Sequence, residues 1–226
     1  MTDAPDTPRD ESRVQIGQLR SDQIDEAGLI LARAFLDERF FTYALCSDRD
    51  KRLEATIPVM RAAVRAHMPY GGVHSAVRDD ELVGVAIRIP PEHNPLGRAE
   101  SIRFFLRLVP AGARLLIRCP GARHLFRAVS EFDKVKPRDV PYWYMVQIGV
   151  RPDVQGQGIG GRLTQLTLDN ADAAGVGCYF ETAGEKTRAL YEKRGFRVRD
   201  ELTPIDGGPT IWTMWRDPRS GKSEPS

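Results

Sequence analysis

The chain carries four glycines within seven residues, in the run Gln155-Gly156-Gln157-Gly158-Ile159-Gly160-Gly161. An apolar segment at 144–150 precedes this run, and an amphipathic segment at 162–174 follows it. Glycine allows tight turns and close approach of the backbone to a ligand, while the first turn of a helix offers free N–H groups at the positive end of its dipole. The feature predicts a strand-to-helix loop that binds an anionic group.

Two phosphate-binding patterns fit the loop, and they imply different enzymes. Gly156, Gly158 and Gly161 match G-x-G-x-x-G, with Glu181 twenty residues further on, as in a dinucleotide-binding domain. However, residues 151–155 separate the apolar strand from the first glycine, and Pro152 ends that strand early. Too little chain also remains after residue 182 to complete a dinucleotide-binding sheet. The first pattern, and with it a nicotinamide-dependent oxidoreductase, is therefore the weaker alternative.

The second pattern is Q-x-x-G-x-G, formed by Gln155, Gly158 and Gly160. Val150-Arg151-Pro152 precedes it, and Leu-Tyr-Glu-Lys-Arg-Gly-Phe follows at 190–196. This ordered combination resembles the GNAT superfamily of acyl-CoA-dependent N-acyltransferases. The segments 142–144, 178–182 and 211–216 also resemble a bacterial branch of puromycin N-acetyltransferase-like proteins. The chain departs from the resemblance at Gly184, where many members carry Asn, and at Tyr142, where this branch often carries His.

The resemblance implies one α/β domain at 13–217, with a mixed, largely antiparallel sheet that is flanked by helices and splits near Val150. A helical insertion is expected at about 97–136, and disordered tails are expected at 1–12 and 218–226. The implied donor is acetyl-CoA, and the implied acceptor is a primary amine of a small molecule or a protein. The first two helices, the insertion and the last strand would hold this amine.

Backbone groups are the expected cofactor contacts. The pyrophosphate suits the N–H groups of Gln155, Gly156, Gln157, Gly158, Ile159, Gly160 and Gly161. The pantetheine amides and the thioester carbonyl would meet the strand edge at Ile148, Gly149 and Val150. Gly149 either marks a bulge in this strand or makes room for a neighbouring side chain, and the sequence leaves both readings open.

Two side chains are the expected catalytic groups. Tyr191 occupies the family's tyrosine position and can protonate the leaving thiolate. Glu181 follows the second apolar run and is the candidate base, because a base or a water chain must take a proton from an alkylammonium. Asp153 and Glu185 are weaker candidates for that base. Tyr191 as a core residue and Glu181 as a structural cap remain the alternatives.

Bulk properties exclude some partners. Lys and Arg total 33 against 31 Asp and Glu, and the net charge of +2 gives no electrostatic case for nucleic acid. No run approaches the ~20 apolar residues of a membrane span, and residues 1–12 have no apolar core of a secretory signal. We therefore expect a cytoplasmic monomer or homodimer with no membrane partner. The histidines lack metal-ligand spacing, so no metal is expected.

The cysteine pattern favours unpaired thiols. Cys46, Cys119 and Cys178 are odd in number, far apart and set in apolar surroundings, which predicts free core thiols of a reducing compartment. An N-acetyltransferase is the favoured function. A catalytically silent acyl-CoA-binding regulatory module is the alternative that the departures at Gly184 and Tyr142 support.

Overall fold

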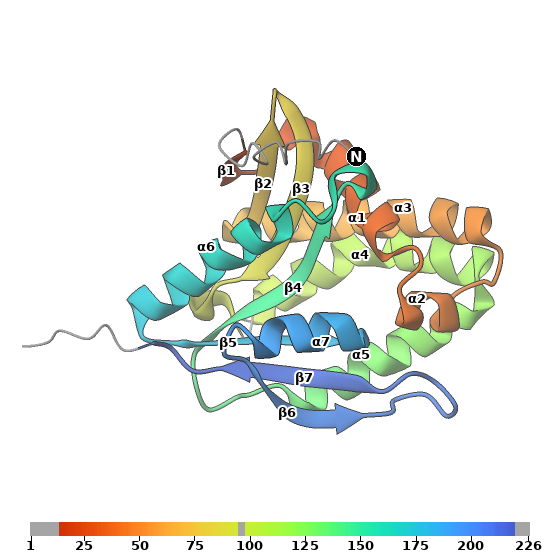
Figure 1. Ribbon diagram of the computed structural model, residues 1–226. Coiled ribbons are helices and arrows are strands. Elements are labelled where there is room, and N and C mark those ends of the chain that lie inside the picture. Colours follow the sequence, from red (N-terminus) through yellow and green to blue (C-terminus); the bar gives the residue numbers. More distant parts are fainter. Residues whose placement is uncertain (1–13, 95–97, 220–226) are drawn as a thin grey trace, which may run out of the picture.

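A seven-stranded mixed sheet forms the centre of the computed structural model, which describes residues 14–94 and 98–219 (Figure 1). The strands are β1 (Gln15–Gln18), β2 (Val73–Arg78), β3 (Glu81–Ile89), β4 (Tyr142–Val150), β5 (Gly177–Thr182), β6 (Arg197–Leu202) and β7 (Ile211–Arg216). They lie in the order β1-β2-β3-β4-β5-β7-β6, and all neighbours are antiparallel except β4 and β5. This confirms the predicted mixed, largely antiparallel α/β fold.

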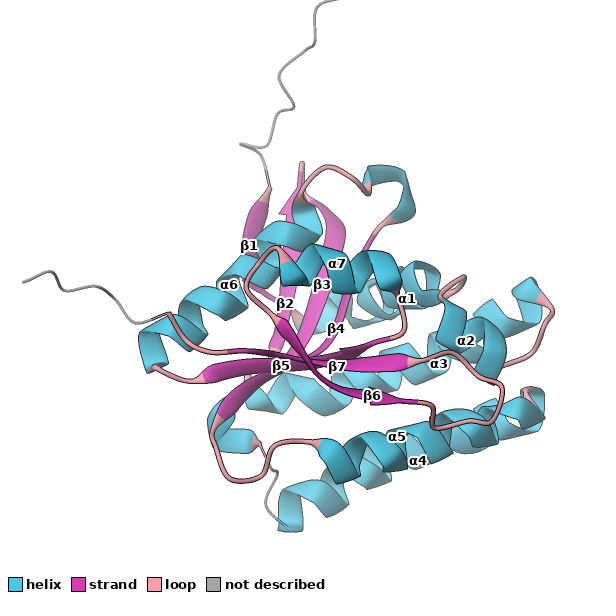
Figure 2. Ribbon diagram, turned by 60° about the horizontal axis from the view of Figure 1, so that its bottom comes forward, coloured by secondary structure: helices cyan, strands magenta, loops and turns pink. Residues whose placement is uncertain are grey.

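Helices cover both faces of the sheet (Figure 2). They are α1 (Ile24–Phe35), α2 (Arg39–Ala44), α3 (Arg49–His67), α4 (Arg98–Arg118), α5 (Arg123–Val135), α6 (Ile159–Ala174) and α7 (Glu185–Glu192). Helices α6 and α7 pack on one face, and α1, α2, α3 and α5 lie on the other. Helix α4 packs against α3. None of these helices is long and apolar enough, within the described ranges, to cross a membrane.

The predicted insertion at 97–136 contains α4 and α5, although residues 95–97 lie outside the described part of the chain. The predicted tail at 1–12 lies outside it as well, as does the tail beyond residue 219. The domain limits at 13 and 217 remain predictions.

The sheet opens between its two parallel strands. Strand β4 pairs with β5 only through Tyr142, Trp143 and Tyr144, which lie opposite Gly177, Cys178 and Tyr179. On its other side, β4 pairs with β3, and the register shifts where Ile87 faces Gln147 but Arg88 faces Met145. Val146 is thus the extra residue of a bulge, which bends a strand and increases its twist. The sheet therefore splits from Met145 onward, earlier than the position near Val150 that the sequence suggested.

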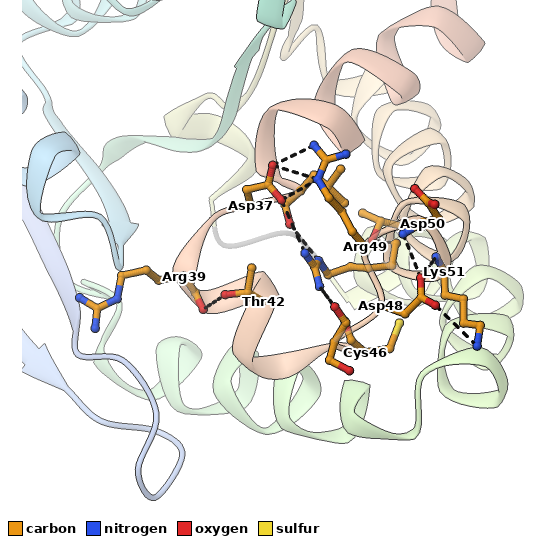
Figure 3. A network of polar contacts seen from close by, with 12 residues as sticks. Asp37, Arg39, Thr42, Cys46, Asp48, Arg49, Asp50 and Lys51 are labelled. Atoms are coloured by element: carbon orange, nitrogen blue, oxygen red, sulfur yellow. Dashed lines mark hydrogen bonds and ion pairs between the residues drawn. The ribbon is translucent and has the colours of Figure 1, made fainter.

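A polar network fixes the loop and short helix between α1 and α3 (Figure 3). The buried Arg52 guanidinium donates to the carbonyl oxygens of Leu36, Cys46 and Ser47 at 2.9, 2.7 and 3.1 Å. Asp48 caps α3 by accepting from the backbone of residues 50 and 51, and Asp37 forms a paired contact with Arg49. Because Arg52 satisfies carbonyls that would otherwise be unpaired, it holds α2 in place over the sheet.

The expectation of three free thiols is wrong for two of them. Cys46 and Cys119 form a disulfide with a Cα–Cα distance of 5.3 Å, and Cys178 is free and buried. The two bonded residues are 73 positions apart in sequence. They meet because the end of α4 packs near the start of α3, a tertiary contact that cysteine spacing alone does not reveal. The bond ties the predicted insertion to the α2–α3 loop.

Acidification should weaken the fold through His67. Its ring nitrogen Nδ1 donates to the Ala63 carbonyl at 2.7 Å, and burial lowers its pKa from 6.5 to about 4. Between these values the unfolded chain binds the proton more tightly, so the free energy of unfolding falls as pH drops from about 6.5 to 4. The loss from this residue is at most about 3.4 kcal/mol. Urea unfolding at several pH values measures it.

The matched variant is His67→Gln, which removes the titrating group. We expect this variant to have a shallower dependence of unfolding free energy on pH over the same range. An unchanged slope would show that His67 is not the group responsible.

Candidate active site

Two adjoining cavities occupy the split between β4 and β5. The α7-side cavity, of about 230 Å³, is lined by Ala34, Phe35, Glu38, Met145, Val146, Gln147, Ile148, Phe180, Glu181, Thr182, Thr187 and Tyr191. The α5-side cavity, of about 200 Å³, is lined by Phe35, Glu38, Phe40, Phe41, Leu125, Val129, Phe132, Tyr144, Val146, Gln147, Glu181, Thr182, Ala183 and Ile211. Six residues line both cavities, so the cavities meet at Phe35, Glu38, Val146, Gln147, Glu181 and Thr182. Two molecules that enter from opposite sides could therefore touch there.

Strand β4 presents unpaired backbone groups to this split. The Arg151 N–H donates to the Val83 carbonyl at 2.9 Å, in the same register that places Gly149 opposite Val85. Backbone groups of an antiparallel strand point alternately to one side and the other. Arg151 and Gly149 therefore face β3, whereas Ile148 and Val150 direct their N–H groups toward the side where β5 has departed. These two N–H groups form an edge that can pair with an extended ligand.

Gly149 packs closely against helix α1, and its contact with a cofactor stays a prediction. A Cβ atom at this position would lie 3.0 Å from Leu31 Cδ2 and 3.1 Å from the Ala34 Cβ of helix α1. The glycine therefore makes room for α1, and the bulge lies instead at Val146. The N–H of Gly149 is directed toward β3 and away from the split, unlike the N–H groups of Ile148 and Val150.

The glycine loop leads directly into helix α6. Gly156 and Gly158 have φ angles of 78° and 80°, a left-handed conformation in which a side chain is strained. Gly158 is the N-cap residue, and neither a capping side chain nor an acidic residue occupies the first turn. The amides of Ile159, Gly160 and Gly161 begin this helix and thus have no acceptor within it. Such an uncapped helix start suits an anionic group.

Neighbouring side chains brace the loop. The Gln155 side chain donates to the Val150 carbonyl at 3.1 Å, and Arg78 donates to Gln157 Oε1 at 2.6 Å. Arg194 donates to the Gly161 carbonyl at 3.2 Å. The side chains of Gln155 and Gln157 therefore shape the loop, which leaves its backbone as the anion-facing surface.

Tyr191 lines the α7-side cavity from helix α7. Its hydroxyl lies 3.0 Å from Thr164 Oγ1, and Thr164 donates its own proton to the Gly160 carbonyl at 2.9 Å. Tyr191 must therefore be the donor to Thr164. Burial raises the pKa of Tyr191, so that the phenol keeps its proton at neutral pH. A neutral phenol at the end of a fixed hydrogen-bond chain can act as a proton donor to a group in the cavity.

Glu181 lies at the junction of the two cavities. Tyr144 donates to its Oε2 atom at 2.9 Å, and Oε1 is buried without a hydrogen bond among the described residues. The nearby Tyr179 hydroxyl lowers the pKa of the same carboxyl, although no hydrogen bond of ordinary geometry joins the two groups. Burial raises the pKa of Glu181, and the positive charge of Lys136 partly opposes this effect. A carboxyl with a raised pKa and a free oxygen is suited to accept a proton.

Sequence reasoning missed two polar residues at the same junction. Glu38 accepts from the Phe40 N–H at 2.9 Å as the N-cap of α2, and burial raises its pKa. Gln147 has a buried Oε1 without a hydrogen bond among the described residues. A polar residue within the apolar strand was the available signal for Gln147. Glu38 gave no such signal, because α2 itself was not predicted.

The weaker base candidates lie elsewhere. Asp153 accepts from Arg151 at 2.9 Å on an exposed turn, and Glu185 forms an exposed ion pair with Arg39 at 3.4 Å. Neither residue is among those that line the two cavities. The structure thus brings Tyr191 and Glu181 together around one cleft and leaves Asp153 and Glu185 outside it.

Comparison with known proteins identifies the family. Residues 33–196 match the model of the acetyltransferase (GNAT) family. The chain is 30% identical over 100 residues to an uncharacterized N-acetyltransferase of Schizosaccharomyces pombe, a match that covers 43% of this chain and 40% of that protein. The chain therefore belongs to the GNAT acetyltransferase family, as its motifs predicted. The narrower resemblance to puromycin N-acetyltransferase-like proteins remains a prediction.

Solved structures share the fold at low identity. A Corynebacterium glutamicum protein described as histone acetyltransferase HPA2 and related acetyltransferase aligns with a TM-score of 0.59 and 18% identity, over 93% of this chain and 99% of that one. The Drosophila melanogaster polyamine N-acetyltransferase aligns with a TM-score of 0.56 and 17% identity, over 90% of this chain and 99% of that one. Arylalkylamine N-acetyltransferase 2 of Aedes aegypti aligns with a TM-score of 0.60 and 12% identity, over 91% of this chain and 99% of that one. These likenesses concern the fold.

A Glu181→Gln variant should separate stability from activity. The amide can still accept from Tyr144 and removes a buried charge, so we expect an unchanged or higher melting temperature, with each kcal/mol gained worth roughly 2–4 °C. The amide cannot accept a proton, so we expect acetyl transfer to fall about 100-fold or more. Thermal unfolding and thiol release measure the two effects. Wild-type activity in the variant would exclude Glu181 as the base.

Proposed function

We propose that this protein transfers an acetyl group from acetyl-CoA to a primary amine, by direct attack of the amine on the thioester. The cleft between β4 and β5 is the main support for this function. It joins a cavity beside Tyr191 to a cavity beside α5, and Glu181 lies at their junction. A direct transfer needs both substrates to meet at one point, and this arrangement provides that point.

The chain offers separate partners for the parts of acetyl-CoA. The uncapped start of α6 and the glycine loop suit the pyrophosphate, because their N–H groups need an acceptor. The open edge at Ile148 and Val150 suits the amides of the pantetheine arm, which would continue the sheet as an added strand. An N–H of the same edge would stabilise the oxyanion that develops on the thioester carbonyl.

Glu181 is proposed to manage the proton of the incoming amine. An alkylammonium with a pKa near 10.4 is almost fully protonated at neutral pH and cannot attack until it loses a proton. The unpaired Oε1 of Glu181 accepts this proton directly or through water. The nitrogen lone pair then attacks the carbonyl carbon and the carbon–sulfur bond breaks. The nitrogen loses its second proton to water as the amide forms, and water returns a proton to the Tyr191 oxygen after it has protonated the thiolate.

Tyr191 is proposed to protonate the departing thiolate. Its hydroxyl, now directed to Thr164, can rotate toward the sulfur, and the Thr164 hydroxyl can then donate to the tyrosine oxygen in turn. No covalent enzyme intermediate is needed. The acid and the base are different residues on the same cleft, which allows both proton transfers in one active site.

The two alternative functions predict different binding. A silent acyl-CoA-binding module would bind acetyl-CoA and release no thiol with any amine. An oxidoreductase would bind a nicotinamide dinucleotide, but among the described strands only β4 and β5 are parallel, which is unlike a dinucleotide-binding sheet. We therefore retain the silent module as the competing reading. A cytoplasmic location is also proposed, although the Cys46–Cys119 disulfide removes the free-thiol argument for a reducing compartment.

The Tyr191→Phe variant tests the acid. Phenylalanine keeps the ring that packs against Phe180 and Phe196, with centroid distances of 4.3 and 5.3 Å, and removes the hydroxyl. We expect turnover to fall roughly 10²-fold or more, with acetyl-CoA affinity changed less than about threefold. Thiol release and calorimetric titration measure these quantities. A large loss of affinity at unchanged turnover would instead make Tyr191 a cofactor-positioning residue.

A further inference from the structure

The α5-side cavity has a polar end and an apolar end. The polar end is the junction with the α7-side cavity, where Glu38, Gln147 and Glu181 lie. The outer part consists of the lining residues that belong to this cavity alone. These are Phe40, Phe41, Leu125, Val129, Phe132, Tyr144, Ala183 and Ile211. All are apolar except Tyr144, and its hydroxyl is already bonded to Glu181.

The polar end matches one ammonium group. Glu181 Oε1 and Gln147 Oε1 are buried acceptors without hydrogen bonds among the described residues, and Glu38 adds a second carboxylate. An ammonium brings three N–H donors and a positive charge, whereas a hydroxyl brings one uncharged donor and a carbonyl brings none. Unpaired buried acceptors are costly, so a donor-rich group is favoured at this end.

We propose that the acceptor is a monoamine with one positive charge and an apolar alkyl or aryl tail, bound with its amine at Glu181 and its tail in the outer part. This proposal rests on the proposed acetyltransferase function and names the substrate class of that site. The amine alone does not define this class, because the outer part of the cavity restricts the group to which the amine can be attached.

The outer part disfavours a second cation. None of its described lining residues carries a negative charge. The Lys136 ammonium lies 4.5 Å from the centroid of the Tyr144 ring and 3.8 Å from the exposed carboxylate of Asp133, so a partly compensated positive charge stands beside this wall. A distal ammonium would lose hydration without gaining a partner and would be repelled by Lys136. An apolar tail would instead gain from contact with the phenylalanine rings of α2 and α5.

Hexylamine and 1,6-diaminohexane test this proposal, because they have the same carbon chain and differ by the distal ammonium. We expect kcat/KM for hexylamine to exceed that for the diamine by about tenfold or more at the same pH and ionic strength, mainly through KM. Phenethylamine should also be a good substrate. Equal or better use of the diamine would overturn the inferred substrate class and leave the acetyltransferase function standing.

A pair of variants locates the effect in the cavity wall. Val129 lines the outer part and is 51% exposed, whereas Val140 lies outside both cavities and is 48% exposed. Val129→Glu places a carboxylate where a distal ammonium would lie, so we expect the hexylamine preference to shrink several-fold. Val140→Glu adds the same charge at similar exposure and should leave the preference unchanged. Equal responses of the two variants would contradict the assigned position of the tail.

Failure of the proposed function would be visible separately. If acetyl-CoA binds but no amine releases thiol, the protein is not an acetyltransferase for these probes. Calorimetric titration of hexylamine and of the diamine into the CoA complex then measures the affinity of the cavity for each amine without turnover. Tighter binding of hexylamine supports the apolar site, and tighter or equal binding of the diamine overturns it.

Discussion

The pairing of β4 with β5 ends after Tyr144, and this separation determines where a ligand can enter the sheet. Backbone N–H and carbonyl groups inside a fold need partners, and two strands that separate leave such groups unmatched along both edges. The bulge at Val146 accompanies the separation, and the alternation that follows directs Ile148 and Val150 toward the opening. The molecule thus contains a strand edge inside its sheet rather than at its margin, and a ligand can complete it.

Several neighbouring features serve this opening. Gly149 lets α1 pack closely on the back of β4, where Leu31 and Ala34 approach it. The Gln155 side chain donates a hydrogen bond to the Val150 carbonyl at the end of the strand and so fixes the start of the glycine loop. Buried Arg52 holds α2 in position, which places Glu38 at the junction of the cavities. Each of these residues acts on the site by positioning backbone.

Two buried acceptor atoms at the junction of the cavities have no hydrogen-bond partner among the described residues. The Oε1 atoms of Glu181 and Gln147 are buried and unpaired among the described residues, and burial raises the pKa of the Glu181 carboxyl. Such groups reduce the stability of the fold unless a ligand satisfies them. Their clustering around one cleft, between the phenol of Tyr191 and the aromatic wall of α2 and α5, is what relates the structure to amine chemistry.

Residues that act through local backbone rules could be predicted from the sequence. The glycine loop and the strand before it follow from local chemistry. The family resemblance gave Tyr191 its position on α7. Features that depend on distant packing could not be read in this way. They include the Cys46–Cys119 bond, helix α2, the bulge at Val146 and the approach of Glu38 to Glu181.

The most direct measurement is a crystal structure of the protein with bound acetyl-CoA. We expect the pantetheine amides to pair with the backbone of Ile148 and Val150, the pyrophosphate to lie at the start of α6, and the acetyl group to lie at the junction of the two cavities. Acetyl-CoA bound elsewhere, or with its acetyl group remote from both Tyr191 and Glu181, would show that the split sheet is not the acetyl-transfer site.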